Sequence, residues 1–379
     1  DGVDIATRDG VLTSTTATAA AALPKAGGTM TGNIVLGTNT VGGLQITTTG
    51  AGNTGLGTGA VDSITTGTND VGLGNNALTA NTTGYNNTAS GFQAMMANTT
   101  GYNNTANGAN TLIANTTGIA NIALGYASLG SNTTASNNTA LGYAALNANT
   151  TASNNTAVGY YALLANTTGI RNTGNGVSTL QSNTTGNDNT ASGMNALFGN
   201  TTGSFNTANG RNALYENTTA SNNTASGYLA LFSNTTGASN VAIGAAALDA
   251  NTTGALNTGI GAYALSSNTT ATNNTSVGQG SLAANTTGGD NSALGDRALL
   301  ANTTGAQNVA VGRMALQANT TANDNTAVGN YSLFYNTTGV NNTAVGRSVL
   351  EANTTGANNV GIGRSSLISC TTGDYNTAV

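Results

Sequence analysis

Apolar and polar residues recur along this chain with a fixed period of seventeen residues. The triplet Asn-Thr-Thr opens each unit from Asn81 to Asn353, and the same place is held by Thr47, Ile64 and Cys370, each followed by Thr-Thr-Gly. The 323 residues from Thr47 to Cys370 make nineteen full units, and a partial twentieth follows. A strict period of this length indicates a repeat architecture, so the unit is the level at which the sequence should be interpreted.

The unit has the consensus N-T-T-[GA]-x-x-N-T-A-[VLISN]-G-x-x-A-L-x-[AS], whose positions we number as places one to seventeen. Asn, Thr and Gly are poor helix formers. Place eight is β-branched or Ser, place nine is small and place ten is often Val, Leu or Ile, an alternation that predicts a short strand. Asn-Thr-Thr-Gly predicts a turn.

Two short strands and two turns would use about seventeen residues, the length of one coil of a narrow β-solenoid. The predicted fold class is therefore all-β, a repetitive β-solenoid or β-roll fibre. Coils that stack at the ~4.8 Å spacing of hydrogen-bonded strands would form a rod about 90 Å long over nineteen coils.

The apolar content of each unit bears on how the rod is stabilised. We expect Leu at place fifteen to face inward together with places eight and ten, while places nine and eleven, always small, face outward. Three buried side chains contribute roughly 1.5–3 kcal/mol each, and ordering costs about 1.5 kcal/mol for each of seventeen residues. Further burial is therefore expected. The smooth stripe at places nine and eleven either packs tightly within the coil or forms an interface between copies, and we favour a parallel homotrimer.

The Asn of place one matches an acceptor pattern for N-glycosylation. The residues that replace this Asn in a few units nevertheless indicate that place one is buried. Ile64 and Cys370 replace it, and Ile and Cys are among the most buried residue types. We therefore expect a buried ladder in which each amide bonds to the next coil or caps a turn, so that the glycan match is coincidental. The candidate structural ladder comprises places one, seven and eleven: Asn81, Asn98, Asn115, Asn132, Asn87, Asn104, Gly91, Gly108 and Gly125.

Place ten changes character along the chain. It is polar at Asn175, Ser192, Asn209 and Ser226, and apolar from Ile243 onward. If place ten faces the rod axis, this polar block would hold ordered water or an ion. The alternative is that place ten is only half-buried.

The variable places are five, six, twelve, thirteen and sixteen, and they carry most of the charges of the repeat region. Charged residues are mostly exposed, so these places are expected to face solvent. Aromatic residues also gather there, and they are the candidate surface contacts: Tyr85, Tyr102, Tyr160 and Phe205.

Composition argues against catalysis and several kinds of partner. The chain has no His and one Cys, so no catalytic triad, zinc site or intrachain disulfide framework can be assembled. Only 6% of residues are charged and no Lys/Arg cluster is present to bind nucleic acid. No apolar run is long enough for a membrane helix. We expect a non-enzymatic protein without a cofactor, a metal, nucleic-acid binding or membrane insertion.

The N-terminal residues differ from the repeats. We divide the chain into an N-terminal stalk or connector at 1–28, a degenerate capping repeat at 29–46 and the seventeen-residue repeat shaft at 47–379. The capping repeat is expected because TMTGNIVLG, residues 29–37, resembles a shortened unit. Because the chain opens on Asp1 and stops inside a unit, we expect it to be a fragment or a processed product.

Two segments carry a resemblance to a known family. ALPKAGGTMTGNI, residues 22–34, resembles a motif of tail fibres of tailed bacteriophages, especially marine ones. NTAVGYYALLANTTG, residues 155–169, resembles the repeats of phage tail-fibre shafts and, more loosely, the head repeats of trimeric autotransporter adhesins. The resemblance covers nearly the whole chain.

The resemblance implies a homotrimeric, β-rich fibre shaft in the virion tail, an extracellular structure that extends toward the host cell. Its implied partners are its own copies, other virion tail proteins at the N-terminal side, and a host surface glycan or protein bound by a distal region outside this chain. A trimeric bacterial surface adhesin and an ice-binding β-solenoid, which would need outward rows of Thr, stay open as alternatives.

Overall fold

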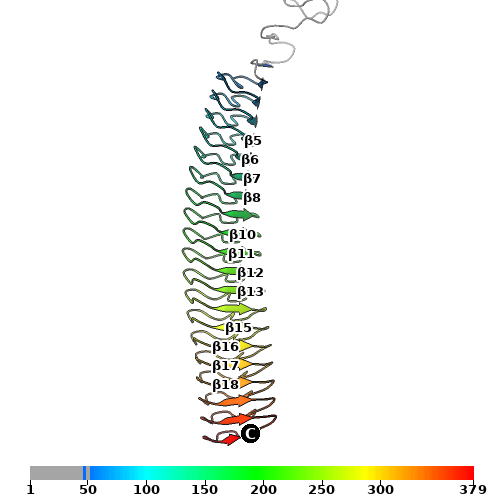
Figure 1. Ribbon diagram of the computed structural model, residues 1–379, viewed down its shortest axis with the longest axis vertical. Coiled ribbons are helices and arrows are strands. Elements are labelled where there is room, and N and C mark those ends of the chain that lie inside the picture. Colours follow the sequence, from blue (N-terminus) through cyan, green and yellow to red (C-terminus); the bar gives the residue numbers. More distant parts are fainter. Residues whose placement is uncertain (1–45, 48–51) are drawn as a thin grey trace, which may run out of the picture.

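The computed structural model describes residues 46, 47 and 52–379, which form an all-β solenoid. Twenty parallel strands, one from each successive coil, stack in sequence order along a long and gently curved rod (Figure 1). The predicted fold class, a β-solenoid with a seventeen-residue period, is confirmed.

The strands are short and evenly spaced in the chain. The first ten are β1 (Ile46–Thr47), β2 (Thr54–Leu56), β3 (Val71–Leu73), β4 (Thr88–Ser90), β5 (Thr105–Asn107), β6 (Ile122–Leu124), β7 (Thr139–Leu141), β8 (Thr156–Val158), β9 (Thr173–Asn175) and β10 (Thr190–Ser192). The others are β11 (Thr207–Asn209), β12 (Thr224–Ser226), β13 (Val241–Ile243), β14 (Thr258–Ile260), β15 (Thr275–Val277), β16 (Ser292–Leu294), β17 (Val309–Val311), β18 (Thr326–Val328), β19 (Thr343–Val345), β20 (Val360–Ile362) and β21 (Thr377–Ala378).

From β2 to β20 every strand occupies places eight to ten and pairs in parallel with the strand of the next coil; β21 covers places eight and nine. The register joins identical places, for example Thr88 with Thr105 and Ala89 with Ala106. β1 is the exception, because it pairs with β2 in the antiparallel direction. The in-register stacking means that each place of the unit forms a continuous row along the rod.

Each described coil contains one strand, so the prediction of two strands per coil is wrong. The second half of the unit is a series of turns instead. In the coil that follows β4, φ is +139° at Gly91, +57° at Gln93 and +49° at Met95, and the same places are left-handed in most other coils. Positive φ at alternating residues curls the backbone and prevents an extended strand.

The orientation of the strand is opposite to the expected one. Places eight and ten face outward, and place nine faces inward, as at Ala89, which is fully buried. Of the two alternatives for the stripe of small residues, the structure shows tight packing within the coil at place nine. The interior has room for little beyond small side chains here: where the larger Val349 stands at place fourteen, a Cβ added to Gly361 at place nine would lie 2.5 Å from Val349 Cγ1.

The core is therefore built from places nine, fourteen and fifteen. Ala89, Ala94 and Met95 in one coil, followed by Leu112 in the next, belong to one continuous apolar cluster along the rod. Leu at place fifteen is the largest buried side chain of most coils. Place fifteen faces inward as expected, whereas places eight and ten do not contribute to this core.

Backbone hydrogen bonds between coils supply much of the remaining stabilisation. The N–H groups of Thr82, Thr83 and Gly84 all point to the carbonyl oxygen of Thr99 in the next coil, at 3.0, 3.2 and 3.3 Å. The Thr82 hydroxyl donates to the same oxygen at 3.1 Å. Each narrow coil is therefore held to its neighbours by hydrogen bonds along the rod axis as well as by its apolar interior.

The expected N-terminal stalk, 1–28, lies outside the described residues, and so does the expected capping repeat, 29–46, except for Ile46. Within the expected shaft, 47–379, the solenoid is continuous from β2 to β21. None of the residues that the structure describes forms a helix long and apolar enough to cross a membrane.

Candidate functional site: asparagine ladders and an outer strand face

The place-one asparagines form an unbroken ladder inside the rod. Asn98 Nδ2 donates to Asn81 Oδ1 of the previous coil at 3.0 Å and to the carbonyl oxygen of Gly101 in its own turn at 3.0 Å. The same pair of bonds recurs in every coil up to Asn353. Each amide therefore both joins two coils and caps a turn, and these side chains are fully buried.

The place-seven asparagines form a second ladder beside the first. Asn104 N donates to Asn87 Oδ1 at 3.0 Å, and Asn104 Nδ2 donates to the carbonyl oxygen of Gly118 at 2.9 Å. Asn115 Nδ2, from place one, donates to that same oxygen at 3.1 Å. The carbonyl oxygen of place four thus accepts from both ladders. This explains why places one and seven are both Asn, since each must supply an amide donor to that oxygen.

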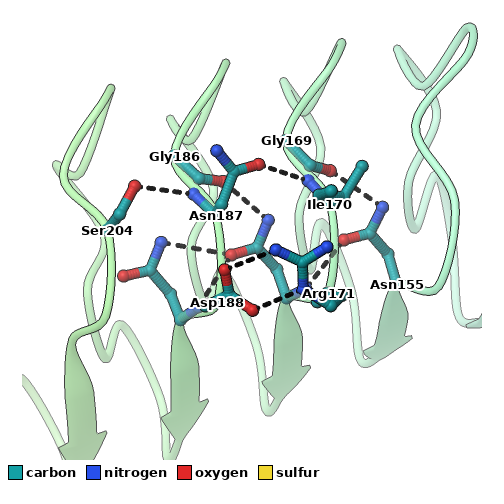
Figure 2. Close-up of polar contacts among 10 residues, drawn as sticks. Asn155, Gly169, Ile170, Arg171, Gly186, Asn187, Asp188 and Ser204 are labelled. Carbon is teal, nitrogen blue, oxygen red and sulfur yellow. Dashed lines mark hydrogen bonds and ion pairs between the residues drawn. The ribbon is translucent and has the colours of Figure 1, made fainter.

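Figure 2 shows part of the place-seven ladder in the middle of the rod, together with contacts at places five and six beside it. Asn155 Nδ2 donates to the carbonyl oxygen of Gly169 at 2.9 Å. At place five the backbone N–H of Ile170 donates to Asn187 Oδ1 at 2.8 Å, and Asn187 N donates to Ser204 Oγ at 2.9 Å. A polar side chain at place five therefore extends the hydrogen bonding to a variable place.

An exposed ion pair lies next to these contacts at place six. Arg171 Nε and Nη2 donate to the two carboxylate oxygens of Asp188 in the next coil, at 2.6 and 2.8 Å. The guanidinium holds the pKa of Asp188 below its ordinary value through these hydrogen bonds. The pair is exposed to solvent, and exposed pairs of this kind contribute little to stability.

The invariant glycine of place eleven has a steric reason. Gly91, Gly108 and Gly125 have φ of +139°, +131° and +116°. A Cβ at Gly91 would lie 2.5 Å from the carbonyl oxygen of Gly108. Any side chain would therefore meet backbone of the next coil in an unfavourable conformation, and only glycine permits this close stacking.

One coil near the N-terminal end replaces both ladder asparagines together. Ile64 stands at place one and Asp70 at place seven. Because Ile64 offers no amide oxygen to Asn81, Asn81 Nδ2 donates to Asp70 Oδ2 instead, at 2.9 Å. Asn87 N donates to Asp70 Oδ1 at 2.8 Å. Burial raises the pKa of Asp70, partly offset by the hydrogen bonds from Asn87 and Asn81. The two substitutions compensate each other.

Cys370 interrupts the place-one ladder at the other end. Its thiol lies 3.7 Å from the carbonyl oxygen of Gly373 and accepts from Asn376 Nδ2 at 3.7 Å. Because a thiol offers no amide donor, Asn353 Oδ1 accepts no hydrogen bond within the described residues. The half-buried Cys370 has no oxidation partner among them, since it is a free cysteine.

The buried ladders also bear on modification and on catalysis. Asn98 is shielded from solvent and its amide nitrogen makes two hydrogen bonds, so a glycan cannot be attached without opening the coil. Among the described residues, no three His, Cys, Asp or Glu side chains gather in a way that could hold a metal ion.

The outward side of the strands carries a feature that the sequence reasoning placed inside the rod. Places eight and ten form what we call the outer strand face. From β13 to β20 its place-ten row is apolar in eight consecutive coils: Ile243, Ile260, Val277, Leu294, Val311, Val328, Val345 and Ile362. Ile243, Leu294 and Ile362 are each exposed by about two fifths of their surface, at 41%, 41% and 42%.

The polar block of place ten lies on the same outward face. Asn175 and Asn209 are exposed, and Ser192 and Ser226 are half-buried. The hypothesis of an internal water or ion site at this block is therefore wrong. The half-buried alternative fits Ser192 and Ser226, whereas Asn175 and Asn209 are more exposed than it expects. Strand alternation indicated correctly that places eight and ten share a side, but the narrow interior, which accepts only Ala, Gly or Ser, decides which side.

The candidate surface aromatics differ in how much of the ring is free. Tyr85 and Tyr102 stack on each other with ring centroids 4.6 Å apart. Tyr160 stacks on Tyr143 at 5.4 Å, so this ring also shares one face with a neighbour. Phe205 is 60% exposed and makes no ring contact among the described residues. Tyr85 and Tyr102 are therefore adjacent, whereas Tyr160 and Phe205 lie in other coils, so the four residues do not form one site.

A scan against protein-family models found no match for this chain, and a search of curated proteins found none either.

Proposed function

We propose that this chain is the structural shaft of a homotrimeric fibre, of the kind found in phage tail fibres, that extends toward a host cell surface and helps attachment. The role is mechanical rather than catalytic: the shaft provides reach and stiffness. Its other proposed partners are tail proteins at the N-terminal side and a host glycan or protein bound by a distal region.

The observation that carries the proposal is the uninterrupted axial hydrogen bonding. The place-seven ladder runs from Asn53 to Asn376 without a break, and the place-one ladder from Asn81 to Asn353 accompanies it. No coil within this span lacks its bonds to both neighbours, so no hinge interrupts the rod. A uniform rod about 90 Å long, from nineteen steps of ~4.8 Å, suits a spacer better than a compact binding domain.

The outer strand face supports self-association. Removing its partly exposed Ile, Val and Leu side chains from water would contribute on the order of 1 kcal/mol each. Charged residues lie two residues further along the chain, at Asp296, Arg313, Arg347 and Arg364, and would form a polar rim beside the apolar row. Because all copies have the same coil spacing, parallel copies can match every coil of this row at once.

The mass of the protein in solution tests the proposal. We expect sedimentation equilibrium to give three times the chain mass of 37.0 kDa, and electron microscopy to show rods about 90 Å long. A variant with Ile260→Asp, Val277→Asp and Leu294→Asp should be monomeric, because like charges would meet in the apolar row. The matched variant Thr253→Asp, Thr270→Asp and Thr287→Asp, at the exposed place three of the same coils, should stay trimeric. A wild-type monomer at micromolar concentration would contradict the proposal.

The two alternatives differ in observable ways. A trimeric bacterial adhesin would share the rod but continue into a membrane anchor, which the complete gene would reveal. An ice-binding solenoid would need a regular outward Thr row. Place eight is not such a row, because Val71, Ile122 and Val309 interrupt it. Place three is one, since it is Thr and exposed in each described repeat, as at Thr253 and Thr270. Thermal hysteresis of freezing by the purified chain would favour the ice-binding alternative over the fibre.

A further inference from the structure

The row of place-twelve side chains contains one interval flanked by aromatic rings. In successive coils this place is Phe92, Ala109, Tyr126, Tyr143 and Tyr160. Phe92 and Tyr126 are exposed, at 50% and 49%. Since identical places stack in register, the small Ala109 leaves an interval between two exposed rings.

Among the described residues, neither ring stacks on another aromatic ring across that interval. Tyr126 stacks on Tyr143 with centroids 5.3 Å apart and an interplanar angle of 18°, which occupies the side of Tyr126 away from Ala109. Phe92 makes no ring contact among the described residues. The stacked rings Tyr143 and Tyr160 offer no comparable space, because they already contact each other at 5.4 Å.

The size of the interval suits one six-membered ring. Phe92 and Tyr126 are two coils apart, a separation of ~9.6 Å at the ~4.8 Å spacing of parallel strands. Groups that stack on an aromatic ring lie about 4.5 Å or more from its centroid. One ring therefore fits between the two aromatic side chains, above Ala109.

The polar group beside Ala109 distinguishes a sugar from an aromatic ligand. Asn107, at place ten of this coil, is exposed, whereas Leu124 and Leu141 hold that place in the following coils. The side chain of Ala109 itself is half-buried, so it forms an apolar floor beside Asn107. An apolar floor beside an exposed amide, with aromatic walls, complements a ring that has apolar faces and hydroxylated edges.

We propose that this interval is a binding subsite for one pyranose unit of a polysaccharide. Phe92 and Tyr126 hold the two faces of the sugar ring, Ala109 provides the floor, and Asn107 binds a hydroxyl group at its edge. The site goes beyond the role of a spacer, since it gives the shaft its own ligand, and it does not depend on the number of chains in the fibre.

Saturation-transfer NMR with the full chain tests this subsite. The probes are short soluble oligosaccharides of glucose, galactose, mannose and N-acetylglucosamine. We expect at least one of them to receive saturation from the protein. Ala109→Tyr fills the interval with the residue that place twelve has in the next three coils, and should weaken binding by about tenfold or more, the loss expected when a stacking contact is removed. Phe92→Ala should weaken it similarly.

The matched control is Ala262→Tyr, which introduces the same side chain at place twelve where neither neighbouring coil has an aromatic residue there. It should leave binding unchanged. Absence of binding to all four sugars, binding that persists in Ala109→Tyr, or displacement of the sugar by Ala262→Tyr would each overturn the proposal. Sedimentation of the same variants separates this result from the fibre proposal, because the trimer mass should not change.

Discussion

The interior of the rod and its outer strand face follow opposite rules. Inside, places one, seven, nine and eleven barely change from coil to coil, because each contacts the same place of the neighbouring coil. Outside, place ten changes from Leu124 to Asn175 to Ile243 while the backbone stays the same. The interior therefore specifies the rod, and the outer face can vary along it and carry contacts with other molecules.

The largest effect is expected from breaking the interior ladder. Asn206→Ala removes the bond from Asn206 Nδ2 to the carbonyl oxygen of Ala220 and leaves Asn223 N without its acceptor, two contacts of 2.8 and 3.0 Å. We expect the free energy of unfolding to fall by about 2–4 kcal/mol, because a buried donor loses its partner. Thr202→Ala, at the exposed place three of the same coil, should change it by less than about 0.5 kcal/mol. Denaturant unfolding measures both, and similar losses would erase the distinction between interior and exterior.

A packing pair inside the rod should show strong coupling. Gly361 at place nine accommodates the large Val349 at place fourteen of the previous coil. Gly361→Ala alone should destabilise the protein by about 1–3 kcal/mol through overpacking. With Val349→Ala, which restores the usual Ala at both places, the added methyl group should be tolerated. Additive losses in the double-mutant cycle would contradict this account of the interior.

The Ile64 and Asp70 pair predicts a pH dependence at the N-terminal end. Burial raises the pKa of Asp70 above its ordinary value of 3.8, so the folded state keeps the proton to higher pH than the unfolded state. Stability should therefore decrease as pH rises from 3.8 through the raised pKa, and then level off. The double variant Ile64→Asn and Asp70→Asn restores both ladders and should lose this pH-dependent part of the stability.

Unfolding in denaturant at several pH values measures the difference between this double variant and the wild type. The single variant Asp70→Asn should be less stable than the double one, since Asn81 Nδ2 would then lose its acceptor at Asp70. A difference between variants that is constant across the pH range would contradict the assigned role of Asp70.

The smallest expected effect is at the other end of the ladder. Cys370→Asn supplies the amide donor that Asn353 Oδ1 lacks, and should stabilise the last coils by about 1 kcal/mol. Slower amide hydrogen exchange in residues 353–367 checks this, with Cys370→Ser as the control that does not reach the ladder. Equal exchange in both variants would show that the ladder adds nothing there.

Much of this structure follows from the repeat itself. The period, the strand at places eight to ten and the burial of Asn98 were predictable, since Ile64 and Cys370 mark place one as an interior position. Which side of the strand faces inward was not predictable, because alternation separates the two sides without showing which of them faces the interior. The small residues of place nine, such as Ala89, suggested a smooth outer stripe. A narrow interior requires small residues for a different reason, and the sequence does not distinguish the two.

The second half of the unit was also beyond sequence reasoning. Leu at place fifteen adopts a left-handed conformation, as at Leu112 with φ of +46°, which side chains such as Leu rarely take. Stacking between coils outweighs this local preference. The outer strand face and the interval above Ala109 emerged only once the inward side of the strand was known.

Site-specific cross-linking tests most directly whether the outer strand face joins the copies. In a Cys370→Ser background, a single cysteine replaces either Val345, at place ten, or Thr338, at the exposed place three of the same coil. A short thiol-specific cross-linker should join chains efficiently through Val345→Cys and not through Thr338→Cys, at protein concentrations where the fibre is assembled. Efficient linkage through Thr338→Cys with none through Val345→Cys would contradict the account.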